Sequence, residues 1–123
     1  MRELVEAVRA FLEQKAIPEL KGHTAFHARV AANALAIVAR QLERGAQSDT
    51  EELASLRVLL GKNGSLEALN RTLCSAIRTG ELDILSPQLQ QHLEHHTRAK
   101  IEIDQPTYSG LRIARERDTE ITH

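Results

Sequence analysis

Two pairs of histidines have a spacing that could bind a metal ion from one face of a helix. His23 and His27 are four residues apart, and so are His92 and His96. Two such pairs that faced each other could hold zinc, which accepts imidazole nitrogens in tetrahedral geometry. Both pairs are expected to lie toward the apolar faces of their helices. A histidine at such a position more commonly bonds a backbone carbonyl, and no acidic residue stands where a carboxylate ligand would be needed. We therefore expect the protein to hold no metal and no cofactor.

Asn70 and four arginines are further candidates for binding. Asn70 falls between apolar positions of an expected helix, which predicts a buried and hydrogen-bonded amide. Its partner would be Asn33, Arg29 or a backbone carbonyl, and contact with a ligand is the alternative. The arginines could bind a phosphate or a carboxylate, or they could form a solvated face or pair with nearby glutamates. They are Arg29, Arg40, Arg71 and Arg78.

Several common chemistries lack their sequence signatures. The single cysteine, Cys74, excludes an internal disulfide, and its apolar surroundings favour a packing role. The sequence has no Gly-x-Ser-x-Gly turn, no Walker loop and no Cys-x-x-Cys pair. Sixteen Lys and Arg residues against 17 Asp and Glu give a net charge of −1, which does not favour nucleic acid as a partner.

Length and composition predict one small helical domain. The 123 residues include only two Phe and one Tyr, so Leu and Ala must build most of the core. Both residue types favour helices, whereas the residues that fill sheets are scarce. No apolar run reaches the roughly 18 residues of a membrane span, and the first residues lack the layout of a secretory signal. We expect a cytoplasmic protein without a membrane partner.

The apolar periodicity predicts an all-α bundle of five helices, over residues 2–16, 24–44, 48–60, 65–79 and 87–105. Gly45 is expected to end the second helix, Ser65 to begin the fourth and Gly80 to end it. The third helix is expected to begin with a capping box, formed by Ser48 with Glu51 or by Asp49 with Glu52. Residues 107–123 are poor in apolar side chains, which predicts a mobile tail. The expected domains are therefore a bundle over 1–106 and a flexible tail over 107–123.

The second predicted helix is apolar on nearly every side, which is typical of a central helix packed by several neighbours. Its large apolar residues are Phe26, Val30, Ile37, Val38 and Leu42. A flank of alanines would let another helix approach closely, and we expect it to form a homodimer of at least about 1,200 Å² in total. These alanines are Ala25, Ala28, Ala32, Ala36 and Ala39.

Four segments of the chain resemble a small bacterial all-helical family of unknown function. They are residues 26–35 (FHARVAANAL), three pairs within 69–78 (Leu69-Asn70, Leu73-Cys74 and Ile77-Arg78), residues 80–83 (GELD) and residues 100–108 (KIEIDQPTY). Members of that family are similar to domains encoded beside, or fused to, aminoglycoside-phosphotransferase-like kinases and acyl-CoA dehydrogenases. The resemblance implies an accessory role. It marks six candidate ligand-binding or partner-binding residues, namely His27, Arg29, Asn33, Asn70, Arg78 and Tyr108.

The leading functional prediction is a non-catalytic accessory or interaction module. Its partner would be a kinase-like phosphotransferase in acyl-CoA or related small-molecule metabolism, as the resemblance implies. The alternative is a protein that binds a small ligand or a metal, or an enzyme, through His27, Arg29 and Asn70. An exposed apolar patch would favour the first prediction, and a concave polar site would favour the second.

Overall fold

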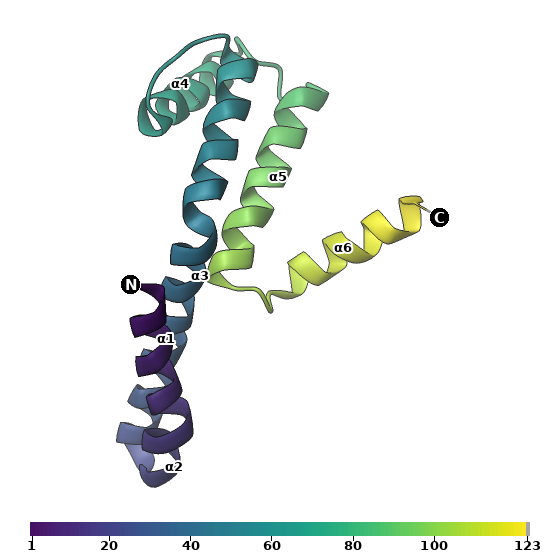
Figure 1. Cartoon of the computed structure of the whole chain (residues 1–123). Helices are drawn as coiled ribbons and strands as arrows, with labels where there is room; N and C mark the ends of the chain where they lie inside the picture. The colour runs from purple at the N-terminus through teal and green to yellow at the C-terminus, as the bar shows by residue number, and fades with distance from the viewer. Residues whose placement is uncertain (123) are drawn as a thin grey trace. The chain divides into compact units, whose positions relative to one another are not determined.

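The computed structural model describes residues 1–122, which form helices and no strand. Helix α1 (Arg2–Phe11) continues through a π-helical stretch (Leu12–Ala16) into the short α2 (Ile17–Glu19). The longer helices α3 (Gly22–Leu60), α4 (Leu66–Thr79), α5 (Pro87–Asp104) and α6 (Ser109–Thr122) follow (Figure 1). The predicted all-α class is confirmed, and five of the described helices have ten residues or more.

The chain divides into two compact units. The N-terminal unit comprises Met1–Ala46 and Ile103–Gln105, and the C-terminal unit comprises Gln47–Glu102 and the described residues from 106 onward. Helix α3 contributes residues to both units. The predicted division into a bundle over 1–106 and a tail over 107–123 stays a prediction.

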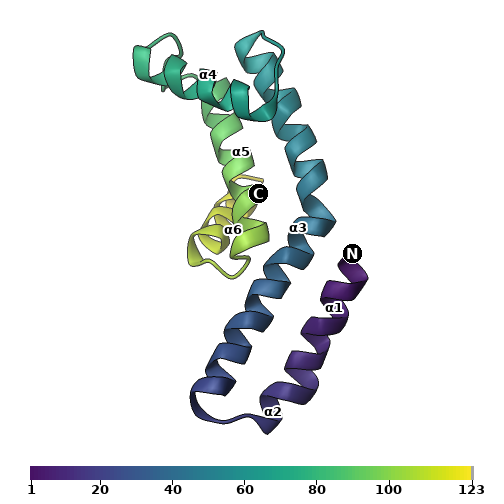
Figure 2. The ribbon, with the colours of Figure 1, turned by 90° about the vertical axis from the view of Figure 1, so that its left-hand side faces the viewer.

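The N-terminal unit is a helical hairpin in which α1 runs antiparallel to the first part of α3 (Figure 2). The turn reaches α3 at Gly22, which has a φ of +63° that glycine adopts at no steric cost. Ala25, Ala32 and Ala39 are at most 5% exposed, and their spacing of seven residues places them on one side of α3. The buried side of α3 in the N-terminal unit is therefore formed by these alanines.

Within the N-terminal unit, four large apolar residues of α3 are exposed. Phe26 and Val30 are 56% and 50% exposed, and Val38 and Leu42 are also exposed. The prediction of a central helix packed on several sides is therefore wrong within the N-terminal unit. The prediction that a flank of alanines on this helix is free to bind a second copy is also wrong, because three of the five alanines are buried inside the chain.

One continuous helix replaces the two helices predicted over 24–44 and 48–60. Gly45 lies inside α3, and residues 46–50, which were expected to contain a cap, are helical. Glycine costs only about 1 kcal/mol relative to alanine inside a helix, so it does not stop one by itself. No proline stands between Gly22 and Leu60 to enforce the break.

The segment expected to lack structure forms α6. Leu111 and Ala114 are buried, and Arg98 of α5 reaches Asp118 of α6 at 2.5 Å. Arg115 also lies 3.3 Å from Glu102. The sequence prediction failed here because two apolar residues and pairing with α5 suffice to place a charged helix. The flexibility expected of residues 107–123 stays a prediction.

The core of the C-terminal unit is a cluster of leucines contributed by α3, α4 and α5. Its buried members are Leu56, Leu69, Leu73 and Leu89. The predicted ends of α4 are confirmed: the Ser65 hydroxyl accepts a hydrogen bond from the Ala68 N–H at 3.1 Å, and Gly80 ends the helix with a φ of +81°. Cys74, expected among packing residues, is exposed.

Candidate functional site: a groove lined by histidines

The C-terminal unit contains an open groove of about 1030 Å³, which we call the histidine groove. One wall comes from the last turns of α3 and the other from the first half of α5, two helices that run side by side in Figures 1 and 2. Apolar atoms form most of its surface. The lining residues from α3 are Glu51, Ala54, Ser55, Val58 and Leu59, those from the loop between α4 and α5 are Leu82 and Ser86, and those from α5 are Gln88, Gln91, His92, His95 and His96.

A hydrogen bond joins the two walls. Ser55 Oγ and His92 Nδ1 lie 2.6 Å apart, and the tautomer of His92 decides which atom donates. A serine beside an imidazole is also the arrangement of an activated nucleophile. Ser55, however, lies inside α3, where backbone N–H groups are engaged in the helix and cannot form an oxyanion hole. The bond therefore fixes the His92 ring rather than preparing a nucleophile.

Three histidines of α5 contact one another along the groove, with their rings tilted or edge-to-face. The ring centroids of His92 and His96 are 4.6 Å apart, and those of His95 and His96 are 4.8 Å apart. His92 and His96 are 6% and 7% exposed, which agrees with the prediction that this pair faces an apolar side. His23 and His27, by contrast, are exposed on α3 in the N-terminal unit, so the same prediction is wrong for them.

Both buried histidines are held in the neutral form. Burial is the main cause that lowers the pKa of His92, and the neighbouring His96 adds to it. Burial also lowers the pKa of His96, followed by the charge of His95. Among residues 1–122, no group of three or more histidine, cysteine or acidic side chains is arranged to hold a metal ion.

The pKa shifts predict a loss of stability in mild acid. A histidine in the unfolded chain has a pKa near 6.5, so above that pH both states are neutral and these groups contribute nothing. As the pH falls below about 6.5, the unfolded chain takes up protons first, and the free energy of unfolding decreases. Urea denaturation at pH 7.5 and 5.5 should show this decrease.

A His96→Gln variant should lose less stability between these two pH values than the wild type. The other charged and titratable groups around the rings remain in the variant, so the difference isolates His96. They are Glu51, Glu52, His92, His95 and Lys100. An equal decrease in both proteins would assign the pH dependence to those other groups.

A buried carboxylate stands beside the histidines. Glu52 is 4% exposed, and its Oε1 accepts hydrogen bonds from Lys100 Nζ at 3.2 Å and from Asn70 Nδ2 at 3.4 Å. The sequence interpretation placed this glutamate at a helix start and missed it. Its signal was the spacing of four and seven residues to Leu56 and Leu59, which puts Glu52 on the apolar face.

The six residues marked by the family resemblance divide between the two units. Asn70, half-buried, binds Glu52 rather than Asn33, Arg29 or a backbone carbonyl, so the partners predicted for it are wrong. Together with Arg78 it lines a groove of about 470 Å³ on α4. Tyr108 lines another of about 450 Å³, formed with α5 and α6. The remaining three are exposed on α3 in the N-terminal unit: His27, Arg29 and Asn33.

Fold and site together define a small all-α protein with a leucine core and a histidine-lined groove. The family model of a domain of unknown function, DUF6285, matches residues 18–108, which is more than half of the chain. The protein therefore belongs to this family. No curated protein and no solved structure matches the chain. Among the described residues, no helix is both long and apolar enough to cross a membrane.

Proposed function

We propose that the protein is a non-catalytic interaction module that forms a homodimer through the apolar surface of its N-terminal unit. The proposal rests on the exposure of large apolar side chains from both helices of the hairpin. This apolar surface comprises Leu4, Val8 and Phe11 of α1 and Phe26, Val30, Val38 and Leu42 of α3, which are 43–63% exposed.

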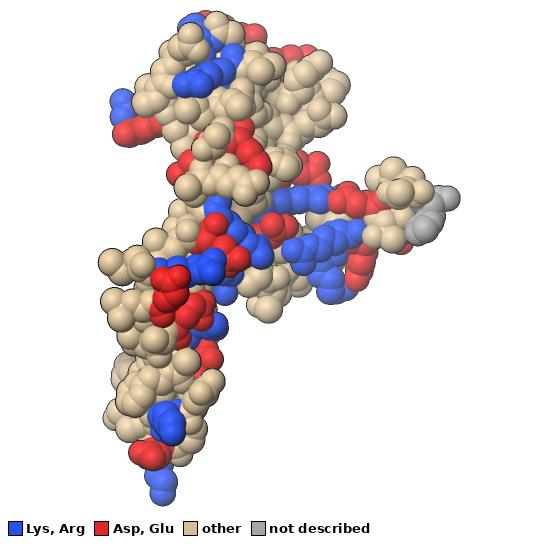
Figure 3. Space-filling model, viewed as in Figure 1, with Lys and Arg blue, Asp and Glu red and all other residues tan. Residues whose placement is uncertain are grey.

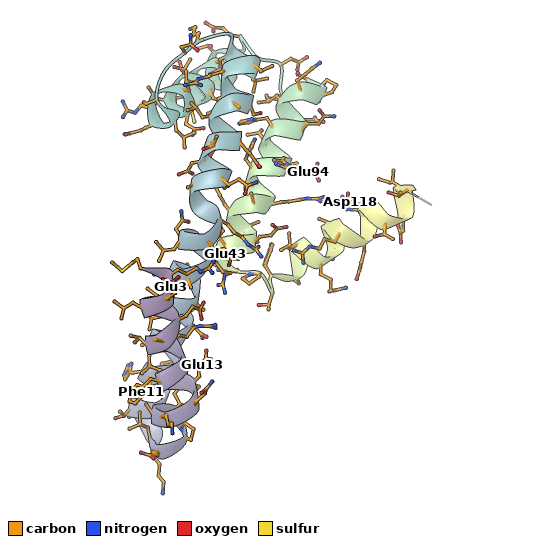
Figure 4. The ribbon with its side chains drawn as sticks, viewed as in Figure 1. Glu3, Phe11, Glu13, Glu43, Glu94 and Asp118 are labelled. Atoms are coloured by element: carbon orange, nitrogen blue, oxygen red, sulfur yellow. The ribbon has the colours of Figure 1, made fainter. Side chains whose placement is uncertain are left out.

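The spacing of these residues favours a continuous surface. Leu4, Val8 and Phe11 follow each other at four and three residues, so they share one side of α1. Figure 4 places Phe11 and Glu13 on opposite sides of that helix. Figure 3 shows uncharged atoms along one flank of the hairpin and charged side chains along the other.

The size of the surface supports a specific interface. Its seven residues together leave several hundred Å² of apolar surface exposed per chain, on the scale of the roughly 300–600 Å² patches that are often functional on a monomer. A standard interface buries about 800 Å² on each partner. Nearby charges pair within the chain, because Arg9 contacts Glu6 at 2.7 Å and Glu13 at 3.7 Å. The apolar surface therefore does not need a partner of opposite charge, and a second copy of this chain can cover it.

Sedimentation at micromolar concentration should show a dimer that weakens at least tenfold on Phe26→Ser or Val30→Ser. Both side chains are at least half exposed, so these substitutions leave the intramolecular core intact. Val58→Ser is the matched control, because Val58 is an 86% exposed apolar residue of the C-terminal unit. A monomeric wild type, or equal weakening by Val58→Ser, would overturn the proposal.

The family resemblance adds a second partner to this proposal. It supports a role in the bacterial cytoplasm, where the same surface, or the arginines beside it, docks on a kinase-like phosphotransferase of acyl-CoA or small-molecule metabolism. Co-expression with the phosphotransferase encoded nearby should give a complex that is retained with Val58→Ser and lost with Phe26→Ser. Failure of the two folded proteins to co-purify would remove this part of the proposal and leave the homodimer to be judged by sedimentation.

A further inference from the structure

We propose that the histidine groove binds a small organic cation, namely a protonated amine carried on a compact apolar body. This site lies in the C-terminal unit and is independent of the dimer proposed above. The inference rests on the juxtaposition of an exposed apolar wall, a carboxylate and two largely buried imidazoles in one groove.

The apolar wall would receive the body of the ligand. It is formed by Ala54, Val58 and Leu59 of α3 together with Leu82. Val58 is 86% exposed, although it sits among residues that pack against the leucine core. Placing an apolar group on this wall would remove the side chain from water, which is favourable by about 25 cal/mol for each Å² covered.

The polar end of the groove would receive the ammonium group. His96 lines this end of the groove and is 93% buried as a residue. Glu51 is the one formally charged residue in the lining, and its Oε2 lies 3.9 Å from His95 Nε2. An ammonium group donates hydrogen bonds to a carboxylate and to an unprotonated imidazole nitrogen alike.

Electrostatics favour a cation over an anion. Lys100, whose charge helps to lower the pKa of both histidines, is paired with the buried Glu52 at 3.2 Å. Burial lowers the pKa of His92 and His96, so these rings offer no positive charge to a carboxylate ligand. An anion would also face Glu51 at the polar end. A hydrated metal ion fits less well, because the described side chains provide no set of three ligands.

The volume of the histidine groove suits a small-molecule ligand. The groove volume of about 1030 Å³ is at the upper end of the 300–1,000 Å³ typical of ligand pockets. Because the groove is open, a fragment-sized probe should bind with a dissociation constant on the order of millimolar. Three probes of nearly equal shape separate the possible head groups: 2-phenylethylamine as the cation, 2-phenylethanol as the neutral form and 3-phenylpropionate as the anion.

The experiment is a titration of the full chain at pH 7.5, followed by two-dimensional NMR of the backbone amides. We expect the amine to bind most tightly and the carboxylate most weakly, with shifts centred on Ser55, Val58, His92 and His96. Glu51→Gln should weaken the amine at least threefold and leave the alcohol unchanged. The substitution keeps a side chain that can accept from Gln47, whose Nε2 donates to Glu51 at 3.0 Å.

Two controls keep the result specific. Glu67→Gln removes the same charge from an exposed site of α4 and should leave all three affinities unchanged. Val58→Ser should weaken all three probes, because it alters the shared apolar wall. Equal affinity for the three probes, tighter binding of the carboxylate, no binding of the amine, or an unchanged amine affinity in Glu51→Gln would each overturn the proposal. None of these outcomes depends on self-association.

Discussion

Leu56→Ala is expected to lower the free energy of unfolding by about 2–5 kcal/mol, the range measured for leucine truncations in protein cores. Leu56 has no exposed surface, and it packs in a cluster with Leu69, Leu73 and Leu89. These residues come from three helices, so a cavity at Leu56 removes contacts that hold α3, α4 and α5 together. Urea denaturation followed by circular dichroism measures the loss.

Val58→Ala provides the matched control for this prediction. Val58 lies two residues further along the same helix and is 86% exposed. Its truncation should change the free energy of unfolding by no more than about 0.5 kcal/mol, as for most surface substitutions. Similar losses for both variants would mean that the leucine cluster is not the core of this unit.

Local signals were enough to predict the parts of the fold that local interactions build. Ser65 caps α4 through a hydrogen bond three residues away, and Gly80 ends it by its own backbone conformation. Leu56, Leu69 and Leu73 were recognisable as core residues because each lies on the apolar side of a periodic segment. None of these features requires knowledge of which helices pack together.

The errors arose where contacts between distant residues decide the outcome. Helix α6 is held by pairs such as Arg98 with Asp118, which are 20 residues apart. The buried side of α3 could not be chosen from its sequence, because alanines and large apolar residues both covered its surface. In the structure the alanines Ala25, Ala32 and Ala39 are buried and Phe26 is exposed.

The candidate site was only partly predictable for the same reason. His92 and His96 stood out by their spacing of four residues, which follows from the helix alone. Their partners Ser55 and Lys100 could not be assigned, since Ser55 is 37 residues from His92 and Lys100 is 48 residues from Glu52. Such contacts depend on how α3 and α5 are aligned, and one sequence does not determine that alignment.

Lys100→Ala is expected to destabilise the C-terminal unit by about 1–3 kcal/mol, because it leaves a buried acceptor short of a partner. Lys100 has a side chain that is 61% exposed, whereas the Glu52 side chain is only 5% exposed. Truncating the lysine therefore removes few buried contacts of its own. Most of the lost stability comes from the Glu52 carboxylate, which stays buried with one partner fewer. Glu52 would keep only the longer hydrogen bond from Asn70, at 3.4 Å.

A second substitution distinguishes this explanation from a loss of packing by the lysine stem. Adding Glu52→Gln to Lys100→Ala replaces the stranded charge with a neutral amide, which is far less costly to bury. The double variant should therefore be more stable than Lys100→Ala alone, a reversal that additive packing losses cannot produce. Lys62→Ala, in the exposed loop before α4, should leave the urea midpoint unchanged. If the double variant is as unstable as the single one, the Glu52 charge is not what Lys100 compensates.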